Sequence, residues 1–273
     1  ASTDVATVLC GAELVFLSVP SQSLRGNLQE WGPLLPKDAI LVSLMKGVEK
    51  ETGLRMSEVI SSVTGFADSQ IAVVSGPNLA LEIAKEQPAA SVAASTNRAA
   101  AETVAKAASN DYFTTFINKD VIGTEFGGIL KNLIAVAIGI VNGVGYGENT
   151  KASIMTRGLA EISRFAVAYG AKATTMVGLA GLGDLIATSE SPLSRNHKAG
   201  EMLGKGYTLR EVLRRMSQTA EGLSSVAPIL QLASAKGVSM PIVEQVQLVL
   251  EGKMDPKDIA PHLTTETDGP QGE

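Results

Sequence analysis

The chain has 273 residues, of which 45% are hydrophobic and 19% are charged, and its formal net charge is −5. This length favours one large domain or two of medium size, and the apolar content is enough for a sizeable core. The negative charge argues against nucleic-acid binding as the main activity, because phosphate backbones select basic surfaces.

The sequence predicts a cytoplasmic protein that does not insert stably into a membrane. Its single cysteine, Cys10, excludes an intrachain disulfide framework, and we expect this residue to be a small buried apolar side chain. The chain begins without the basic region of a signal peptide. Its longest apolar stretch, 126–141, contains Lys131 and Asn132 and is shorter than the roughly 20 residues of a bilayer span.

Short apolar runs alternate with helical patterns in the first part of the chain. Such runs predict strands that are buried on both faces of a mainly parallel sheet, covered by helices. The expected strands are 14–19, 40–45, 71–74, 91–94 and, more weakly, 112–117. The expected helices are 25–31, 51–63 and 97–109.

From about Glu125 helical periodicity replaces the strands, and the domain boundary is expected near residue 118. The expected helices are 126–141, 151–169, 208–216, 226–235 and 242–250. Gly170 suits a left-handed cap, and Thr208 with Glu211 suits a capping box. The predicted fold class is therefore α/β: residues 1–117 are expected to form a truncated, Rossmann-like doubly wound parallel sheet, and residues 118–273 an all-α domain.

Three of the expected strands end in loops of small or polar residues. They are 18–22, Met45-Lys46-Gly47, and Ser75-Gly76-Pro77-Asn78 followed by Ala80. Ligands of open parallel sheets bind beyond the carboxyl ends of the strands, so these loops are candidates for one crevice. The plainer alternative is that glycine and proline only make turns, although a lysine directly after a buried strand is expected to lie in the crevice.

Lys131 lies in a helix that is apolar almost all round and therefore expected to be buried. No acidic residue stands three or four positions away, so its partner must come from elsewhere in the fold or be a ligand. A buried ammonium without a partner is costly, and its pKa falls. The alternative is a lysine that extends to the surface.

Two later segments carry candidate site residues. Asp184, in Gly181-Leu182-Gly183-Asp184-Leu185, is either a turn residue or the missing partner of Lys131. The run Ser194-Arg195-Asn196-His197 precedes an apparent helix start, which is either a phosphate site or a solvated basic patch. Glu221 before Gly222 is a weak signal, and a surface carboxylate is its default interpretation. The two histidines are far apart in sequence, so no metal site is indicated.

These motifs, taken in order, resemble bacterial NAD(P)-dependent glycerol-3-phosphate dehydrogenase. They are Leu44-Met45-Lys46-Gly47, Ser75-Gly76-Pro77 with Ala80, Leu130-Lys131-Asn132, Gly181-Leu182-Gly183-Asp184-Leu185, Ser194-Arg195-Asn196 and Glu221-Gly222. Each motif is weak by itself, but their order and spacing across essentially the whole chain are specific. The resemblance implies interconversion of sn-glycerol 3-phosphate and dihydroxyacetone phosphate with NAD or NADP, a supply of glycerol phosphate for phospholipid synthesis, and a homodimer.

The resemblance also implies a role for individual residues. Lys131 matches the proton donor and acceptor, and Asp184 is expected to orient its amine. The implied substrate contacts are Lys46, Gly76, Asn78, Lys131, Asp184, Ser194, Arg195 and Asn196. The implied cofactor contacts are Lys46, Ala80, Arg195, Thr219 and Glu221. Asn78 stands where the family usually has Ser or Thr, and His197 where Arg is common.

The beginning of the chain departs from the family pattern. The family opens with a strand and a Gly-x-Gly-x-x-Gly turn that holds the pyrophosphate, and no such run precedes Ala1. If the chain truly begins there, we expect little NAD(H) binding and negligible turnover. Two other functions stay open from sequence, namely a related β-hydroxyacid-type dehydrogenase and a non-catalytic binding protein.

Overall fold

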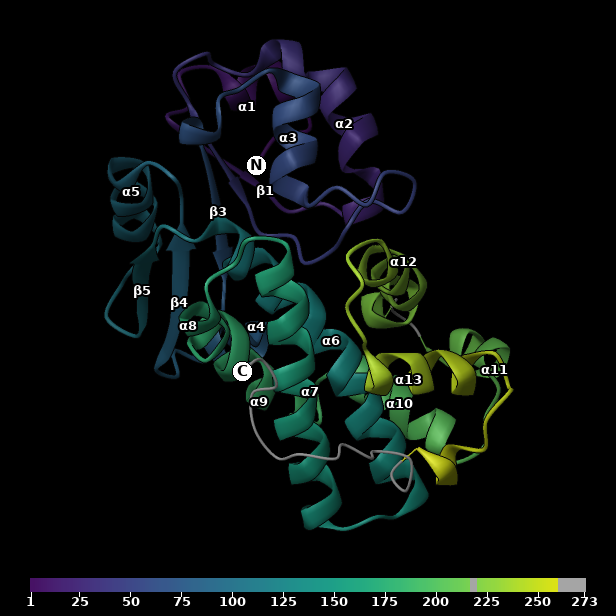
Figure 1. Ribbon diagram of the computed structural model, residues 1–273. Coiled ribbons are helices and arrows are strands. Elements are labelled where there is room, and N and C mark those ends of the chain that lie inside the picture. Colours follow the sequence, from purple (N-terminus) through teal and green to yellow (C-terminus); the bar gives the residue numbers. More distant parts are fainter. Residues whose placement is uncertain (217–219, 260–273) are drawn as a thin grey trace.

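The computed structural model describes residues 1–216 and 220–259, and it places a five-stranded sheet before a set of packed helices (Figure 1). The strands are β1 (Leu14–Leu17), β2 (Ile40–Ser43), β3 (Ile71–Ser75), β4 (Ala89–Ala94) and β5 (Phe113–Asn118). The helices among them are α1 (Val5–Leu9), α2 (Leu24–Trp31), α3 (Met56–Thr64), α4 (Ala80–Ile83) and α5 (Arg98–Ala108).

The remaining helices follow the sheet in sequence. They are α6 (Val121–Val144), α7 (Glu148–Ala168), α8 (Ala173–Met176), the π-helix η4 (Leu179–Gly183), α9 (Asp184–Glu190), α10 (Arg195–Gly204), α11 (Leu209–Arg215), α12 (Glu221–Ala235) and α13 (Pro241–Leu250). Short 3-10 helices are η1 (Ser21–Ser23), η2 (Gly32–Leu34), η3 (Asp68–Gln70) and η5 (Pro256–Asp258). The change from sheet to helices falls between β5 and α6, and the division into two domains at residue 117 stays a proposal.

The five strands lie in the sheet in sequence order. β1, β2 and β3 are parallel, as are β4 and β5, but β4 runs antiparallel to β3. The sheet is thus mainly parallel, as expected, with one reversed pair. Apolar content alone does not report strand direction, because a strand buried on both faces reads the same either way.

Successive side chains of the central strands enter two different cores, because strand side chains alternate between faces. Leu41 and Ile71 pack with α2 and α3, whereas Val42 and Ala72 pack with α5. Both faces of the sheet are therefore covered, which confirms the doubly wound α/β class. Cys10 is exposed, so its expected burial was wrong; it is the cap residue after α1, a short helix that the sequence pattern did not indicate.

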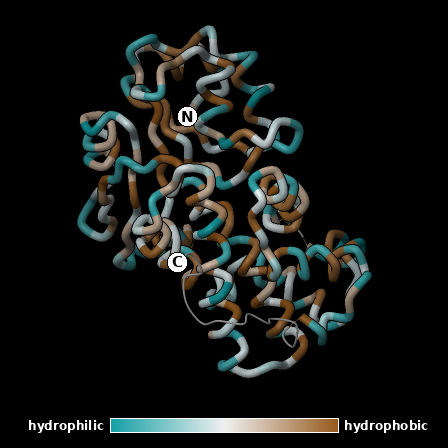
Figure 2. The backbone as a smooth tube through the Cα atoms, viewed as in Figure 1, coloured by the Kyte–Doolittle hydropathy of each residue, from teal (hydrophilic) through white to brown (hydrophobic). Residues whose placement is uncertain are grey.

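Helix α6 forms the centre of the helical part. The Asp120 carboxylate accepts a hydrogen bond from the Gly123 N–H at its start, and Gly145, with φ of 94°, ends it in the left-handed conformation. It has 24 residues, which is long and apolar enough to cross a membrane, but 83% of its most apolar window is buried by the surrounding protein. Figure 2 shows that hydrophobic segments lie inside the helical part and that hydrophilic turns lie around it.

Helices α6 and α10 approach closely through four glycines. A Cβ on Gly139 would lie 2.2 Å from the His197 carbonyl oxygen, and one on Gly200 would lie 2.1 Å from the Val136 carbonyl oxygen. Gly143 and Gly204 repeat the arrangement one turn further on. This backbone-to-backbone packing sets the position of α10, whose first turn carries the candidate phosphate-binding residues.

Several local predictions are confirmed, and some helix boundaries differ. Gly170 has φ of 96° after α7, and the capping box of Thr208 and Glu211 is present at α11. The helix expected over 51–63 begins only at Met56, because Gly53 adopts φ of 71° and Arg55 is an extended N-cap residue.

Candidate active site

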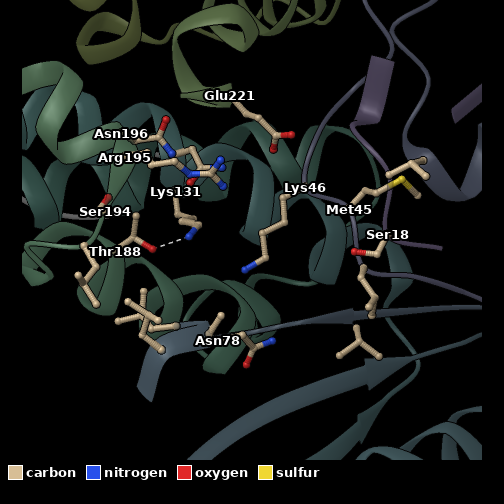
Figure 3. A pocket seen from close by; sticks show the side chains of 18 residues that line it. Ser18, Met45, Lys46, Asn78, Lys131, Thr188, Ser194, Arg195, Asn196 and Glu221 are labelled. Carbon is tan, nitrogen blue, oxygen red and sulfur yellow. Dashed lines mark hydrogen bonds between the residues drawn. The ribbon is translucent and has the colours of Figure 1, made fainter. Parts of the chain in front are cut away.

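The loops after β1, β2 and β3 meet helices α6, α9, α10 and α12 around one pocket of 860 Å³, a size that suits a small ligand or cofactor. Figure 3 shows the side chains of Lys46 and Lys131 next to each other in it. The lining residues are Ser18, Val19, Leu44, Met45, Lys46, Val74, Asn78, Leu79, Ala80, Leu81, Lys131, Asn132, Thr188, Leu193, Ser194, Arg195, Asn196 and Glu221. The expected convergence of the three loops is therefore present.

Asp184 lies between the two lysines. Its Oδ1 accepts a hydrogen bond from Lys131 Nζ at 2.9 Å, and its Oδ2 accepts one from Lys46 Nζ. Lys46 Nζ also donates to the Gly76 carbonyl oxygen at 3.1 Å. Lys131 is only 6% exposed, so the alternative of a lysine extending to the surface is wrong. The buried Lys131 ammonium and the partly buried Lys46 ammonium are thus stabilised by one carboxylate, which lies 53 residues after Lys131 in the sequence.

The environment of Lys131 favours loss of its proton. Burial, and secondly the positive charge of Lys46, lower the pKa of Lys131 from 10.5 to about 8, although the Asp184 carboxylate opposes the change. An amine with a pKa near 8 is populated in both protonation states at neutral to mildly alkaline pH. Such a group can accept a proton in one direction of a reaction and donate it in the other.

Thr188 is a site residue that the sequence analysis did not identify. Its hydroxyl forms a hydrogen bond with Lys131 Nζ (Figure 3). The same hydroxyl lies 3.2 Å from Asp184 Oδ1. Asp184 and Thr188 are four residues apart on α9, so both face α6. The preceding π-helix η4 packs on Gly127 of α6, where a Cβ would lie 2.5 Å from the Ala180 carbonyl oxygen. The four-residue spacing between Asp184 and Thr188 was the sequence signal that could have identified Thr188 as a site residue.

The N-terminus of α10 forms another part of the pocket wall. Ser194 caps the helix by accepting from the His197 N–H, and Arg195 and Asn196 follow in the first turn. Asn196 Oδ1 accepts from the Gly222 N–H at 2.9 Å, which joins α10 to the start of α12. Free N–H groups at a helix start and a guanidinium together suit an anion such as a phosphate.

Glu221, at the start of α12, faces the same cations. Burial raises its pKa, while the positive charges of Arg195, Lys46 and Lys131 oppose that change. It is half-buried in the pocket wall and is therefore not the plain surface carboxylate of the default interpretation. Thr219, the other residue matched to the cofactor near this helix, lies outside the described residues.

The loop after β3 supplies acceptors. Gly76 has φ of 143°, and a Cβ there would lie 3.1 Å from the Ser91 Cα, so the turn requires glycine. Asn78 donates to the Ser91 hydroxyl at 3.2 Å, which leaves its Oδ1 buried without a hydrogen-bond partner among the described residues. A carbonyl oxygen of this kind fits an amide or hydroxyl donor of a ligand. Ala80 begins α4 beside it.

The donors and acceptors fit a dinucleotide and a phosphate ester. Arg195 and Lys46 are cationic, Asn78 has an unused acceptor, and the pocket lies at the carboxyl ends of three parallel strands, where such cofactors bind. Over residues 1–216 and 220–259, no group of three His, Cys, Asp or Glu side chains is placed to hold a metal ion.

Two family models match the chain. Residues 1–101 match the N-terminus, and residues 120–261 match the C-terminus, of NAD-dependent glycerol-3-phosphate dehydrogenase. The chain belongs to this family. The resemblance drawn from the sequence motifs is therefore confirmed, and neither the β-hydroxyacid-type dehydrogenase nor the non-catalytic protein is favoured.

Curated relatives and solved structures agree with this assignment. The chain is 64% identical over 273 residues to a glycerol-3-phosphate dehydrogenase [NAD(P)+] of Leifsonia xyli subsp. xyli, covering 100% of this chain and 74% of the relative. It is 53% identical to the protein of the same name from Frankia casuarinae, covering 99% and 81%. The glycerol-3-phosphate dehydrogenase structure from Coxiella burnetii superposes with a TM-score of 0.90 at 33% identity, covering 96% of this chain and 80% of the other.

A more distant structure shares only the fold. The ketopantoate reductase of Ralstonia eutropha superposes with a TM-score of 0.53 at 17% identity, covering 93% of this chain and 80% of that one. The glycerol-3-phosphate dehydrogenase structure fits much better over a similar share of this chain.

Proposed function

We propose that this protein interconverts sn-glycerol 3-phosphate and dihydroxyacetone phosphate by hydride transfer with NAD or NADP, and that Lys131 is the proton donor and acceptor. The observation that carries the proposal is the buried Lys131 amine, which has a pKa of about 8 and points into a pocket with a phosphate-suited helix start. Membership of the family supplies the reaction and the substrate.

In the oxidation direction, neutral Lys131 removes the proton from the hydroxyl on the central carbon of glycerol 3-phosphate. NAD(P), when bound, supplies the acceptor or donor of the hydride. In the reduction direction, the Lys131 ammonium polarises the carbonyl of dihydroxyacetone phosphate and then donates the proton to its oxygen. The same amine therefore serves both directions, in opposite protonation states.

Asp184 and Thr188 orient the Lys131 amine, whereas burial and the charge of Lys46 lower its pKa. Asp184 and Thr188 hold Nζ by hydrogen bonds from one face of α9. Lys46 adds a second positive charge, which favours the neutral form of Lys131 and attracts the developing oxyanion of the substrate. Asp184 keeps both ammoniums together, a pair that would otherwise repel each other.

The phosphate of the substrate fits the start of α10. Arg195 offers a forked guanidinium, and Ser194 and Asn196 position the helix turn around it. Asn78 lines the pocket and is assigned as a substrate contact, as is Gly76, whose carbonyl oxygen accepts from Lys46 Nζ. For the cofactor, Lys46, Ala80, Arg195 and Glu221 are the contacts that we assign, together with Thr219 from the sequence match.

The wider role is proposed on the same basis. We assign the protein to the cytoplasm, where it supplies glycerol phosphate for phospholipid synthesis, and we expect a homodimer without stable membrane insertion. The single exposed Cys10 and the burial of α6 are consistent with this assignment.

A cofactor-consumption assay tests the activity. The full-length protein is mixed with dihydroxyacetone phosphate and either NADH or NADPH, and loss of the reduced cofactor is followed at neutral pH. We expect substrate-dependent consumption of at least one cofactor. A 2-keto acid that is reduced well in place of dihydroxyacetone phosphate, or no turnover with any of these substrates, would contradict the proposal.

A further inference from the structure

The structure contains a second buried charged cluster, next to the pocket but outside it. Glu125 of α6 is 3% exposed and binds the N-terminus of α3. Its Oε1 accepts from the Ser57 N–H at 2.9 Å, and its Oε2 accepts from the Ser57 hydroxyl at 2.6 Å and from the Arg55 guanidinium. A buried carboxylate that uses both oxygens in this way joins two elements far apart in sequence.

Arg55 is held from several sides. Its guanidinium donates to Glu58 at 2.8 Å and to the Ser57 hydroxyl at 3.0 Å, and it lies 5.9 Å from the centre of the Phe126 ring. Phe126 packs in turn on Phe165 and Tyr169 inside the helical core. Arg55 is therefore attached firmly to α6 and to the aromatic group behind it.

Arg55 is also connected to the loop that carries Lys46. Val48 and Arg55 form an antiparallel bridge, and the Glu49 N–H donates to the Leu54 carbonyl at 2.9 Å. The bridge brings Arg55 into register with a residue only two positions after Lys46. Anything that holds Arg55 therefore limits where Lys46 can lie.

Helix α6 contacts the Lys46 side chain directly as well. A Cβ on Gly128 would lie 3.3 Å from both Cγ and Cδ of Lys46 and 2.5 Å from the Ser75 hydroxyl oxygen. Lys46 therefore lies against the helix that carries Lys131, and a small displacement of the loop changes the separation of the two amines. Val48, 2% exposed, packs in the core around α6 and adds to this attachment.

We infer that Glu125 is a positioning residue, which holds the loop carrying Lys46 against α6 through Arg55 and thereby sets the distance between the two active-site lysines. This inference rests on the proposed function, because it concerns the site that carries out that reaction. Glu125 does not line the pocket, so it acts through Arg55 and Ser57.

A change in the distance between Lys46 and Lys131 can be measured as a change in the pKa of Lys131. The charged groups that face its amine are Lys46 from the β2 loop, Asp184 from α9 and Glu221 from α12. Lys46 lowers the pKa of Lys131, whereas Asp184 and Glu221 raise it. When Lys46 moves away, the lowering influence weakens and Asp184 is left to Lys131 alone, so both changes raise the pKa.

The test compares Glu125→Gln with Glu58→Gln. Both remove one carboxylate partner of Arg55, but Glu58 is only partly buried and its carboxylate pairs with Arg55 at the start of α3, not with α6. Lys131 is acetylated with isotope-coded acetic anhydride across pH 6.5–10, and the label on its peptide is measured by mass spectrometry. We expect the apparent pKa of Lys131 to rise by about half a unit or more in Glu125→Gln, which lowers its neutral fraction at pH 8 roughly twofold, and to stay unchanged in Glu58→Gln.

The titration of Lys131 and the melting temperature together distinguish a Glu125 that positions Lys46 from a Glu125 that only stabilises the fold. A Glu125→Gln protein with a lower melting temperature but an unchanged titration of Lys131 would overturn the inference. If that variant does not fold, Arg55→Lys replaces it, because a lysine keeps the charge but cannot bind Ser57, Glu58 and Glu125 together; an unchanged Lys131 titration there would overturn the inference equally. The labelling needs no turnover, so an inactive wild-type protein would count against the proposed function and not against this inference.

Discussion

Replacing Asp184 by Asn removes the carboxylate between the two lysines while keeping the size of the side chain. The ammonium of Lys131 lies 2.9 Å from Oδ1, and both side chains are buried. Charges about 4 Å apart at the effective dielectric constant of proteins attract by about 4 kcal/mol, which corresponds to roughly 3 pKa units. The amide dipole that remains and rearrangement of the site reduce this value, so we expect the pKa of Lys131 to fall by at least one unit.

The sign of the change decides what the assay shows. Reduction of dihydroxyacetone phosphate uses the Lys131 ammonium, so the rate falls as pH rises through the pKa of this group. In Asp184→Asn the falling limb of kcat/KM, measured over pH 5.5–9.5, is therefore displaced by at least about one pH unit to lower pH. Asp68→Asn, which alters an exposed carboxylate at η3, is the matched control and leaves the profile in place. An unchanged or alkaline-shifted limb in Asp184→Asn would refute the reasoning.

Two further predictions concern stability. Burial raises the pKa of Glu161 to about 7 from 4.5, so its contribution to stability is full below about pH 4.5 and is lost as pH rises through 7. Relative to Glu161→Gln, the wild type should lose about 3 kcal/mol of unfolding free energy across that window, measured by urea denaturation at several pH values, and a pH-independent difference would contradict this. A Cβ on Gly200 would lie 2.1 Å from the Val136 carbonyl oxygen, so Gly200→Ala should cost about 1–3 kcal/mol and weaken substrate binding by displacing α10. Gly26→Ala, in an exposed part of α2 with open space around it, should instead stabilise by about 0.5–1 kcal/mol, and equal melting temperatures for the two variants would argue against the close helix packing.

The strands could be predicted from the sequence because β1 to β4 are largely apolar runs bounded by turn residues, and β5 shows a weaker form of the same pattern. The positions of β1 to β5 followed from that pattern, as did the caps at Gly170 and Thr208. The antiparallel pairing of β3 and β4 could not be predicted, because pairing direction depends on how the segment between these strands folds back.

The candidate site was predicted in part. Lys131 stood out because it had no local partner, and Asp184 was one of the possible partners. Thr188 was missed because η4 and α9 lie in a short glycine-rich segment whose helical character is hard to recognise, so the four-residue spacing from Asp184 had no helix to support it. Glu125 was missed because α6 begins five residues earlier than the apolar pattern, at Val121, which brings this carboxylate into the buried helix.

The central claim is that Lys131 transfers the proton, and its most direct test is the turnover of Lys131→Ala with dihydroxyacetone phosphate and the reduced cofactor that the wild type uses. We predict that kcat falls by about a hundredfold or more, the usual contribution of a positioned acid or base, and that added methylamine restores part of the activity. Near-normal turnover of a folded Lys131→Ala protein would contradict the account.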